Sequence, residues 1–214
     1  IFRISTSGTE RLPKRGPAII TGNHVSHVDP ILLIIGARRT VRFLSKAEHF
    51  NNWFTRLVML TTGQLETKRE TGGKEGMAQA VEVLENGGMM GIFPEGTRSK
   101  KKEPPFLQRG KTGVARLAAT FPDVPVHPIV LLGAREMLTP GSSKFRRKSP
   151  ITISVGHSVT WREWITHPKG GGMDDAALNN LAASEIEARK EHLAVLYRRF
   201  TDQLMGSIQA LGAP

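Results

Sequence analysis

The fold is decided by residues 18–35, which read AIITGNHVSHVDPILLII. The apolar residues 18–20 predict a short buried strand, and Asp29-Pro30 followed by five apolar residues predicts a helix with Asp29 at the N-cap and Pro30 at N1. The polar residues between them form a loop that carries His24. A strand that leads through a short loop into a helix is the repeating unit of α/β folds.

His24 and Asp29 have a spacing that only a turn can bring into contact. Five positions rotate a helix by about 500°, which places the two side chains on different faces, and on a strand an odd offset places them on opposite faces. The predicted loop supplies the turn. A histidine that touches a carboxylate can act as a general base whose tautomer the carboxylate fixes.

Other interpretations of this loop stay open on its residue types alone. Asp29 can be a helix cap and nothing more, and a lone histidine is often an ordinary loop residue. A cluster of His24, His27 and Asp29 could bind a metal, and Ser26 could be a nucleophile. The chain has no cysteine, no His-Glu-x-x-His pattern and no Gly-x-Ser-x-Gly elbow, so we expect no metal site and a Ser26 that hydrogen-bonds within the loop.

A second polar block follows far downstream, where residues 93–99 read FPEGTRS. It comes after the apolar residues 89–93, which predict a buried strand, so by itself it is typical of an ordinary strand-to-loop turn. Its occurrence together with the histidine block favours a functional site. The candidate substrate-binding residues in this block are Glu95, Gly96, Thr97 and Arg98.

The two blocks resemble the signature of the glycerolipid acyltransferase family, of the lysophosphatidic acid acyltransferase type, in which Asn-His-x-Ser-x-x-Asp is followed by Phe-Pro-Glu-Gly-x-Arg-Ser. Residues 63–69 (GQLETKR) and 124–129 (VPVHPI) resemble two weaker family blocks. The four blocks occur in the family's order within a motif-bearing core of about residues 18–132. Glu66 and Lys68 depart from the family pattern, and His127 has no inferred role.

The resemblance implies roles for the candidate residues. His24 is expected to be the general base and Asp29 its orienting partner, while the residues of the 93–99 block position the acceptor. Arg69 and Arg98 are expected to bind its phosphate, because a guanidinium offers two parallel donors. For Arg69, a solvated loop charge is the alternative.

The expected reaction moves a fatty acyl group from an acyl thioester to the free hydroxyl of a lysophospholipid, with 1-acylglycerol 3-phosphate as acceptor and phosphatidic acid as product. It needs no cofactor, and the acyl donor is acyl-CoA or acyl-carrier protein. Three alternatives stay open: an acyltransferase with another polar-lipid acceptor, a non-catalytic phosphate- or lipid-binding module, and a hydrolase that releases the fatty acid to water.

The charge balance indicates an anionic partner. The formal net charge is +11, from 30 basic and 19 acidic residues, and the basic residues cluster in residues 11–15, 38–42, 98–102 and 144–148. Such runs are often only solvated faces, but they also attract phosphate groups. We expect peripheral association with an anionic membrane surface on the cytoplasmic face and no nucleic-acid partner. No apolar run approaches the roughly 20 residues that cross a bilayer, and we expect no secretory signal.

The remaining sequence predicts a single α/β domain over residues 1–214, with a largely parallel, mixed central sheet flanked by helices. Further strands are predicted over 41–44, 126–132 and 151–155, and helices over 52–60, 74–86, 111–120 and 180–210. Trp161 and Trp164 are expected to be packing residues rather than a membrane anchor. The last helix carries an apolar stripe from Ile186 to Leu204 that we expect to face the core, although it could instead meet a membrane or a partner.

Overall fold

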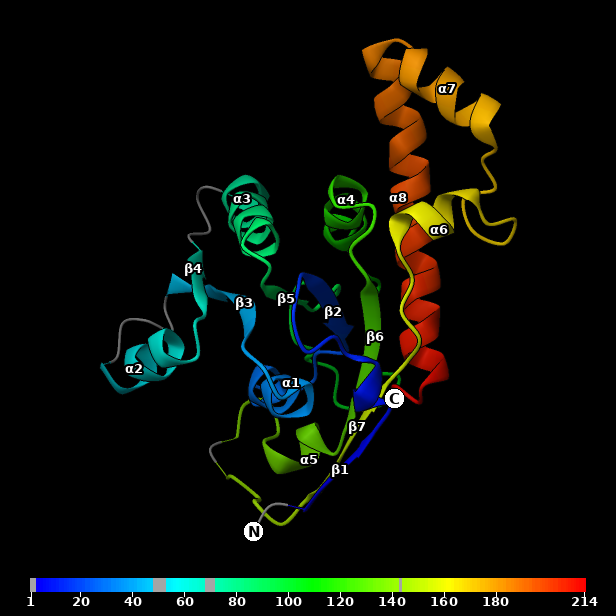
Figure 1. The fold of residues 1–214 in the computed structure, drawn as a ribbon. Coiled ribbons are helices and arrows are strands. Elements are labelled where there is room, and N and C mark those ends of the chain that lie inside the picture. The colour runs from blue at the N-terminus through cyan, green and yellow to red at the C-terminus, as the bar shows by residue number, and fades with distance from the viewer. Residues whose placement is uncertain (1–2, 48–52, 68–71, 143) are drawn as a thin grey trace.

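The computed structural model describes residues 3–47, 53–67, 72–142 and 144–214. Its centre is a seven-stranded sheet in the order β1-β7-β6-β2-β5-β3-β4 (Figure 1). All neighbouring strands are parallel except β6 and β7, which are antiparallel. The predicted class, an α/β domain with a largely parallel mixed sheet, is confirmed. The strands are β1 (Arg3–Ser7), β2 (Ala18–Gly22), β3 (Val41–Lys46), β4 (Leu65–Thr67), β5 (Met89–Ile92), β6 (Val126–Leu132) and β7 (Pro150–Val155).

Helices cover both faces of the sheet (Figure 1). The connections from β2 to β3 and from β3 to β4 advance along the sheet in one direction, whereas those from β4 to β5 and from β5 to β6 return. Since parallel crossovers are right-handed, α1 and α2 lie on one face and α3 and α4 on the other. The helices are η1 (Thr9–Arg11), α1 (Asp29–Ala37), α2 (Trp53–Thr61), α3 (Gly72–Glu85), α4 (Gly113–Thr120), α5 (Ala134–Met137), α6 (Trp161–Thr166), α7 (Asp175–Ala183) and α8 (Ile186–Ala210).

The long helix α8 closes the α3–α4 side of the core. Its residues Leu196, Phe200 and Leu204 are buried in the same apolar cluster as Trp161 and Trp164. The ring of Phe200 lies 5.4 Å from that of Trp161 and 5.1 Å from that of Trp164, centroid to centroid. Both tryptophans are therefore packing residues, as the sequence predicts, and this half of the stripe faces the core.

The C-terminal region differs from the prediction of one helix over residues 180–210. Helix α7 ends at Ala183, Ser184 is extended, and α8 begins at Ile186. Ile186 is 65% exposed, so the predicted stripe does not begin there. Arg189 donates hydrogen bonds to the carbonyl oxygens of Ala182 and Ser184, which joins the two helices at the break.

Among the described residues, no helix combines the length and the apolar character that a membrane crossing requires.

His127 is buried in the sheet without a polar partner. It is the second residue of β6, its side chain is 2% exposed, and neither ring nitrogen has a hydrogen-bond partner. Burial disfavours the charged imidazolium, so the pKa of His127 falls from its ordinary 6.5 to about 4. The neutral ring therefore acts as part of the apolar core.

The free energy of unfolding is expected to depend on His127 below neutral pH. His127 binds a proton near pH 6.5 in the unfolded chain but only near pH 4 in the folded chain. The free energy of unfolding therefore keeps its full value above pH 6.5 and falls as the pH drops from 6.5 to 4. The predicted loss is about 3 kcal/mol. Urea unfolding at pH 7 and pH 4 measures it. His127→Leu should lose about 3 kcal/mol less than the wild type over this range, and equal losses would contradict the assignment.

Candidate active site

The site lies where two adjacent parallel strands end. β2 pairs with β5, and the chain leaves β2 toward α1 on one face of the sheet and leaves β5 toward α4 on the other. Such a switch in direction opens a crevice at the carboxyl ends of the strands. The histidine loop follows β2 and the 93–99 block follows β5, so the topology brings together two segments about 70 residues apart.

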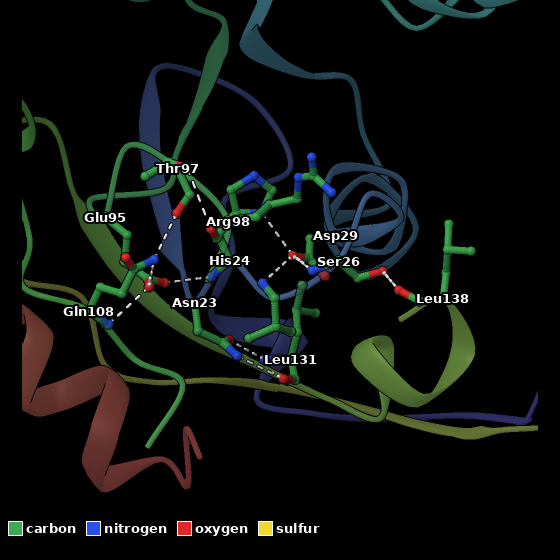
Figure 2. A network of polar contacts seen from close by, with 11 residues as sticks. Asn23, His24, Ser26, Asp29, Glu95, Thr97, Arg98, Gln108, Leu131 and Leu138 are labelled. Atoms are coloured by element: carbon green, nitrogen blue, oxygen red, sulfur yellow. Dashed lines mark hydrogen bonds and ion pairs between the residues drawn. The ribbon is translucent and has the colours of Figure 1, made fainter. Parts of the chain in front are cut away.

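His24 and Asp29 meet across the loop as their spacing requires (Figure 2). The Nδ1 atom of His24 lies 2.8 Å from Oδ2 of Asp29. The same oxygen accepts hydrogen bonds from the main-chain N–H groups of Val25 and Ser26, each at 2.7 Å. The predicted N-cap role of Asp29 is wrong, because Asp29 is the first residue of α1, Val28 is its N-cap, and the carboxylate turns back toward the loop.

The environment of Asp29 fixes the histidine tautomer. Asp29 is fully buried, and burial raises the pKa of its carboxyl, although the hydrogen bonds from His24, Ser26 and Val25 oppose this shift. Three donors converge on one oxygen, which suits an ionised carboxylate because it accepts and does not donate. The Nδ1 atom of His24 therefore carries the hydrogen, and its Nε2 atom keeps a lone pair for a proton in the adjacent cleft.

Two side chains anchor the histidine loop to strand β6 and to the segment after α5. The amide of Asn23 donates to the carbonyl oxygen of Leu131 at 3.0 Å and accepts from the N–H of Leu131 at 2.8 Å. The Ser26 hydroxyl donates to the carbonyl oxygen of Leu138 at 2.8 Å. Ser26 thus bonds within the loop through its main-chain N–H, which donates to Asp29, whereas its hydroxyl bonds to a residue beyond α5. Both residues hold the loop that presents His24 (Figure 2).

Glu95 connects the histidine loop to the segment before α4. Its Oε1 atom accepts from the main-chain N–H of His24 at 2.7 Å, and its Oε2 atom accepts from the main-chain N–H and the side-chain amide of Gln108 at 2.9 and 3.2 Å. The residue is 3% exposed, and burial raises the pKa of its carboxyl. Both carboxylate oxygens accept hydrogen bonds from protein donors, so Glu95 affects the site by holding the main chain of His24 in position.

Lys111 lies close to Gly96, a proximity that the sequence prediction missed. Gly96 has φ of +72°, and a Cβ atom there would lie 2.9 Å from Nζ of Lys111. The main-chain N–H of Lys111 donates to the carbonyl oxygen of Pro94 at 2.7 Å. Glycine thus permits the turn and leaves room for the lysine, which lines the same cleft as His24. The signal in the sequence is faint, because Lys111 lies 15 positions after Gly96.

The rest of the 93–99 block is placed around the dyad. Arg98 is partly buried, and burial lowers the pKa of its guanidinium. The charge of Asp29 opposes this shift, so the guanidinium lies within electrostatic reach of that carboxylate (Figure 2). Thr97 is exposed, and its hydroxyl contacts the carbonyl oxygen of Arg98 at 3.4 Å. Ser99 donates its main-chain N–H to the carbonyl oxygen of His24 at 2.9 Å. Arg69 lies outside the described residues.

A cleft of about 540 Å³ extends from His24 between the sheet and helices α3 and α4. It is lined mainly by apolar side chains and glycines, among them Phe43, Leu44, Met77, Met90, Ile92 and Leu117. Its shape and lining suit a hydrocarbon chain, with His24 and Lys111 at its polar part.

A stack of aromatic rings fixes the wall next to His24. The imidazole stacks on Phe93 at 4.1 Å between centroids, and Phe93 stacks on Phe43 at 5.3 Å. A Cβ atom on Gly91 would lie 2.2 Å from the Phe43 ring, so only glycine leaves space for this ring. The stack therefore depends on Gly91 in β5, and it orients the plane of the imidazole.

Within the described ranges, no group of three or more His, Cys, Asp or Glu side chains could hold a metal ion.

Comparison with known proteins defines the class. A family model described as Acyltransferase matches residues 3–132. The chain belongs to the acyltransferase family. The match begins at β1, earlier than the core of residues 18–132 that the four blocks indicate, and it contains the complete histidine and 93–99 blocks.

Two relatives of this chain are both named 1-acyl-sn-glycerol-3-phosphate acyltransferase. The chain is 29% identical over 128 residues to the 1-acyl-sn-glycerol-3-phosphate acyltransferase of Borreliella burgdorferi, which covers 56% of this chain and 51% of that protein. It is 27% identical over 146 residues to the protein of the same name from Bacillus subtilis, which covers 66% and 70%. The chain thus spans about half the length of the first of these relatives.

A solved structure shares the fold. The 1-acyl-sn-glycerophosphate acyltransferase PlsC from Thermotoga maritima superposes with a TM-score of 0.63 at 24% sequence identity, over 95% of this chain and 72% of that one. At this identity the likeness supports the fold alone.

Proposed function

We propose that this chain transfers a fatty acyl group from an acyl thioester, acyl-CoA or acyl-carrier protein, to the free hydroxyl of 1-acylglycerol 3-phosphate and so makes phosphatidic acid. The observation that carries the proposal is the His24–Asp29 pair at 2.8 Å beside an apolar cleft. The names of the relatives from Borreliella burgdorferi and Bacillus subtilis support this acceptor.

The proposed step needs one proton transfer and no covalent enzyme intermediate. Nε2 of His24 removes the proton from the acceptor hydroxyl while its oxygen attacks the thioester carbon, and Asp29 stabilises the imidazolium that forms. The new C–O bond replaces the C–S bond. The thiolate leaves readily because a thiol has a pKa of about 8.5, and it takes the proton back from His24.

The acceptor phosphate is proposed to bind Arg98 and Lys111, with Arg69 as a further candidate. Arg98 supplies a planar set of donors and Lys111 a mobile ammonium, a pairing that suits a phosphate dianion. Gly96 serves the site by leaving room for Lys111, and Glu95 serves it by holding the main chain of His24. Thr97 is a candidate donor at the exposed rim of the turn.

Removing either cation should weaken the binding of the phosphorylated acceptor. We expect Arg98→Ala and Lys111→Met each to raise the acceptor KM about 10- to 100-fold, because a charge-assisted hydrogen bond is lost, while the KM for acyl-CoA changes less. Steady-state kinetics with each substrate varied in turn measure this. Arg199→Ala, on the exposed face of α8, is the matched control. An unchanged acceptor KM in both variants would contradict the phosphate roles.

An acceptor panel tests the proposed substrate. With one acyl donor, we expect kcat/KM to be much higher for 1-acylglycerol 3-phosphate than for 1-acylglycerol or a lysophospholipid with a bulky headgroup. A preference for another polar lipid would identify that lipid as the acceptor, while the acyl-transfer reaction would stand. Binding of all acceptors without product would identify a non-catalytic binding module.

We further propose that the protein works at an anionic membrane surface on the cytoplasmic face. Its acceptor and product are lipids, and its formal net charge of +11 favours anionic headgroups.

A further inference from the structure

Helix α2 presents large apolar side chains to the outside. Trp53, Leu57 and Leu60 are 76%, 53% and 58% exposed, and their spacing of four and three positions places them on one side of the helix. Arg56 is exposed on the same side. A short helix with one outward apolar face and a flanking arginine is typical of segments that lie in a membrane interface.

Further apolar side chains lie at the same edge of the molecule. Ile31 and Ile35 of α1 are each 47% exposed, and α1 and α2 cover the same face of the sheet (Figure 1). α1 follows the carboxyl end of β2 and α2 follows that of β3, so both helices start from the edge of the sheet that holds His24. Phe145, 50% exposed, is in the loop that joins α5 to β7 at this edge.

Basic side chains predominate next to these residues, although Glu136 of α5 and Glu66 of β4 are also exposed. The loop of residues 138–149 contains Lys144, Arg146, Arg147 and Lys148, all exposed, and no acidic residue. α2 contains no acidic residue, and the acidic residue of α1, Asp29, is buried. Acidic side chains such as Asp174, Asp175 and Glu187 instead occupy α7 and the start of α8, at the far end of the molecule (Figure 1). An apolar patch beside a cluster of cations matches the surface of an anionic bilayer.

The patch and the cleft lie on opposite faces of the sheet, beside its edge at β3 and β4, since α2 covers one face and the cleft lies between the other face and helices α3 and α4. Leu44, which lines the cleft and is 41% exposed, belongs to β3, and Thr67, which also lines it, belongs to β4. These are the two strands that α2 connects. A lipid that leaves a bilayer beside α2 would pass around this edge of the sheet, where Leu44 is partly exposed, to enter the cleft.

We propose that Trp53, Leu57 and Leu60 of α2, together with the basic loop of residues 144–148, form the docking surface for an anionic bilayer, from which the cleft takes its lipid acceptor. This inference rests on the proposed function for the identity of the lipid, but the surface can be tested without catalysis. The three apolar side chains enter the interface, and the loop cations contact the headgroups.

Intrinsic fluorescence tests the surface directly. The chain has three tryptophans, of which Trp161 and Trp164 are 6% and 5% exposed, so Trp53 is the one that reports the surface. With vesicles of phosphatidylcholine and phosphatidylglycerol we expect a blue shift of the emission and quenching by brominated lipid. Trp53→Phe should bind the vesicles and lose both signals. Bound protein with unchanged Trp53 emission would overturn the proposal.

Vesicle flotation with matched variants supplies the second test. We expect Leu57→Ser/Leu60→Ser to lower the partition coefficient about tenfold or more, since apolar area no longer enters the interface. Ile186→Ser/Val195→Ser removes side chains that are 65% and 66% exposed on α8 and should bind as the wild type does. Equal binding by both variants would overturn the proposal, as would self-association through α2 without vesicle binding.

Activity on dispersed substrate distinguishes a failure of the docking surface from a failure of the proposed acyltransferase function. With a short-chain acceptor and thioester below their micellar concentrations, Leu57→Ser/Leu60→Ser should retain wild-type turnover and lose activity only on vesicle-bound acceptor. Wild-type turnover by this variant on both substrates would overturn the docking surface alone. Absence of turnover by the wild type would count against the proposed function, while the fluorescence result would still decide the surface.

Discussion

Replacing His24 with alanine is expected to lower kcat for acyl transfer about 10²- to 10⁴-fold, which is the usual contribution of a positioned general base. The imidazole is the one group in the described site that combines a free ring nitrogen, contact with a buried carboxylate and access to the cleft. The acceptor KM should change little, because the base acts on the transition state more than on binding. Release of free thiol from acyl-CoA measures the loss.

His27→Ala is the matched control for this variant. His27 is an exposed histidine on the same loop, so its loss changes the composition of the loop but leaves the dyad in place. We expect kcat within about twofold of the wild type, in line with the small effect of most surface substitutions. A His24→Ala variant that is as active as His27→Ala would refute the assignment of the base.

Asp29→Asn is expected to lower kcat by a similar factor, about 10²- to 10⁴-fold. In the serine proteases, the same change beside a catalytic histidine costs about 10⁴-fold because the imidazole takes the wrong tautomer. Here one oxygen of Asp29 accepts from His24, Val25 and Ser26. An amide in its place either turns an N–H toward the imidazole or keeps an oxygen there without the charge that stabilises the imidazolium.

The Asp29 prediction needs a check on folding, because the residue is fully buried. Circular dichroism and thermal melting should show a folded Asp29→Asn variant. Asp123→Asn, at an exposed ion pair with Arg162, is the control for a neutralised aspartate and should keep normal kcat. A folded Asp29→Asn variant with wild-type kcat would show that the carboxylate has no part in the reaction.

The parts of the fold that follow from strong local patterns could be predicted. The apolar run of residues 126–132 forms β6 and is buried except for the partly buried Leu132, and the predicted strand over residues 151–155 alternates between buried and partly buried side chains as β7. β1 and β4 were missed, because β1 is a mostly exposed edge strand and β4 has only three residues. Edge strands lack the continuous apolar pattern that marks a buried strand.

Local signals also failed at the C-terminal helices. The break at Ser184 contains no glycine or proline, so the sequence of residues 180–210 gives no clear stop. The interruption is visible only in the structure, where the carbonyl oxygens of Ala182 and Ser184 receive hydrogen bonds from Arg189.

In the site, the contact between His24 and Asp29 could be predicted from their spacing, because only a turn allows it. The role of Glu95 could not be deduced, since its partners are the main chain of His24 and Gln108, which only the tertiary fold brings together. Lys111 was missed for the same reason. Residue types and spacing thus identify the reacting groups, whereas the groups that hold them in place depend on contacts between distant loops.

The most direct test of acyl transfer follows thiol and product together. The wild-type protein is mixed with 1-acylglycerol 3-phosphate and either acyl-CoA or acyl-carrier protein, free thiol is followed by absorbance, and phosphatidic acid is quantified by mass spectrometry. We expect that, with at least one donor, thiol and phosphatidic acid form in equal amounts and that thiol release stops when the acceptor is omitted. Thiol release at the same rate without acceptor, or no phosphatidic acid with either donor, would contradict the proposed reaction.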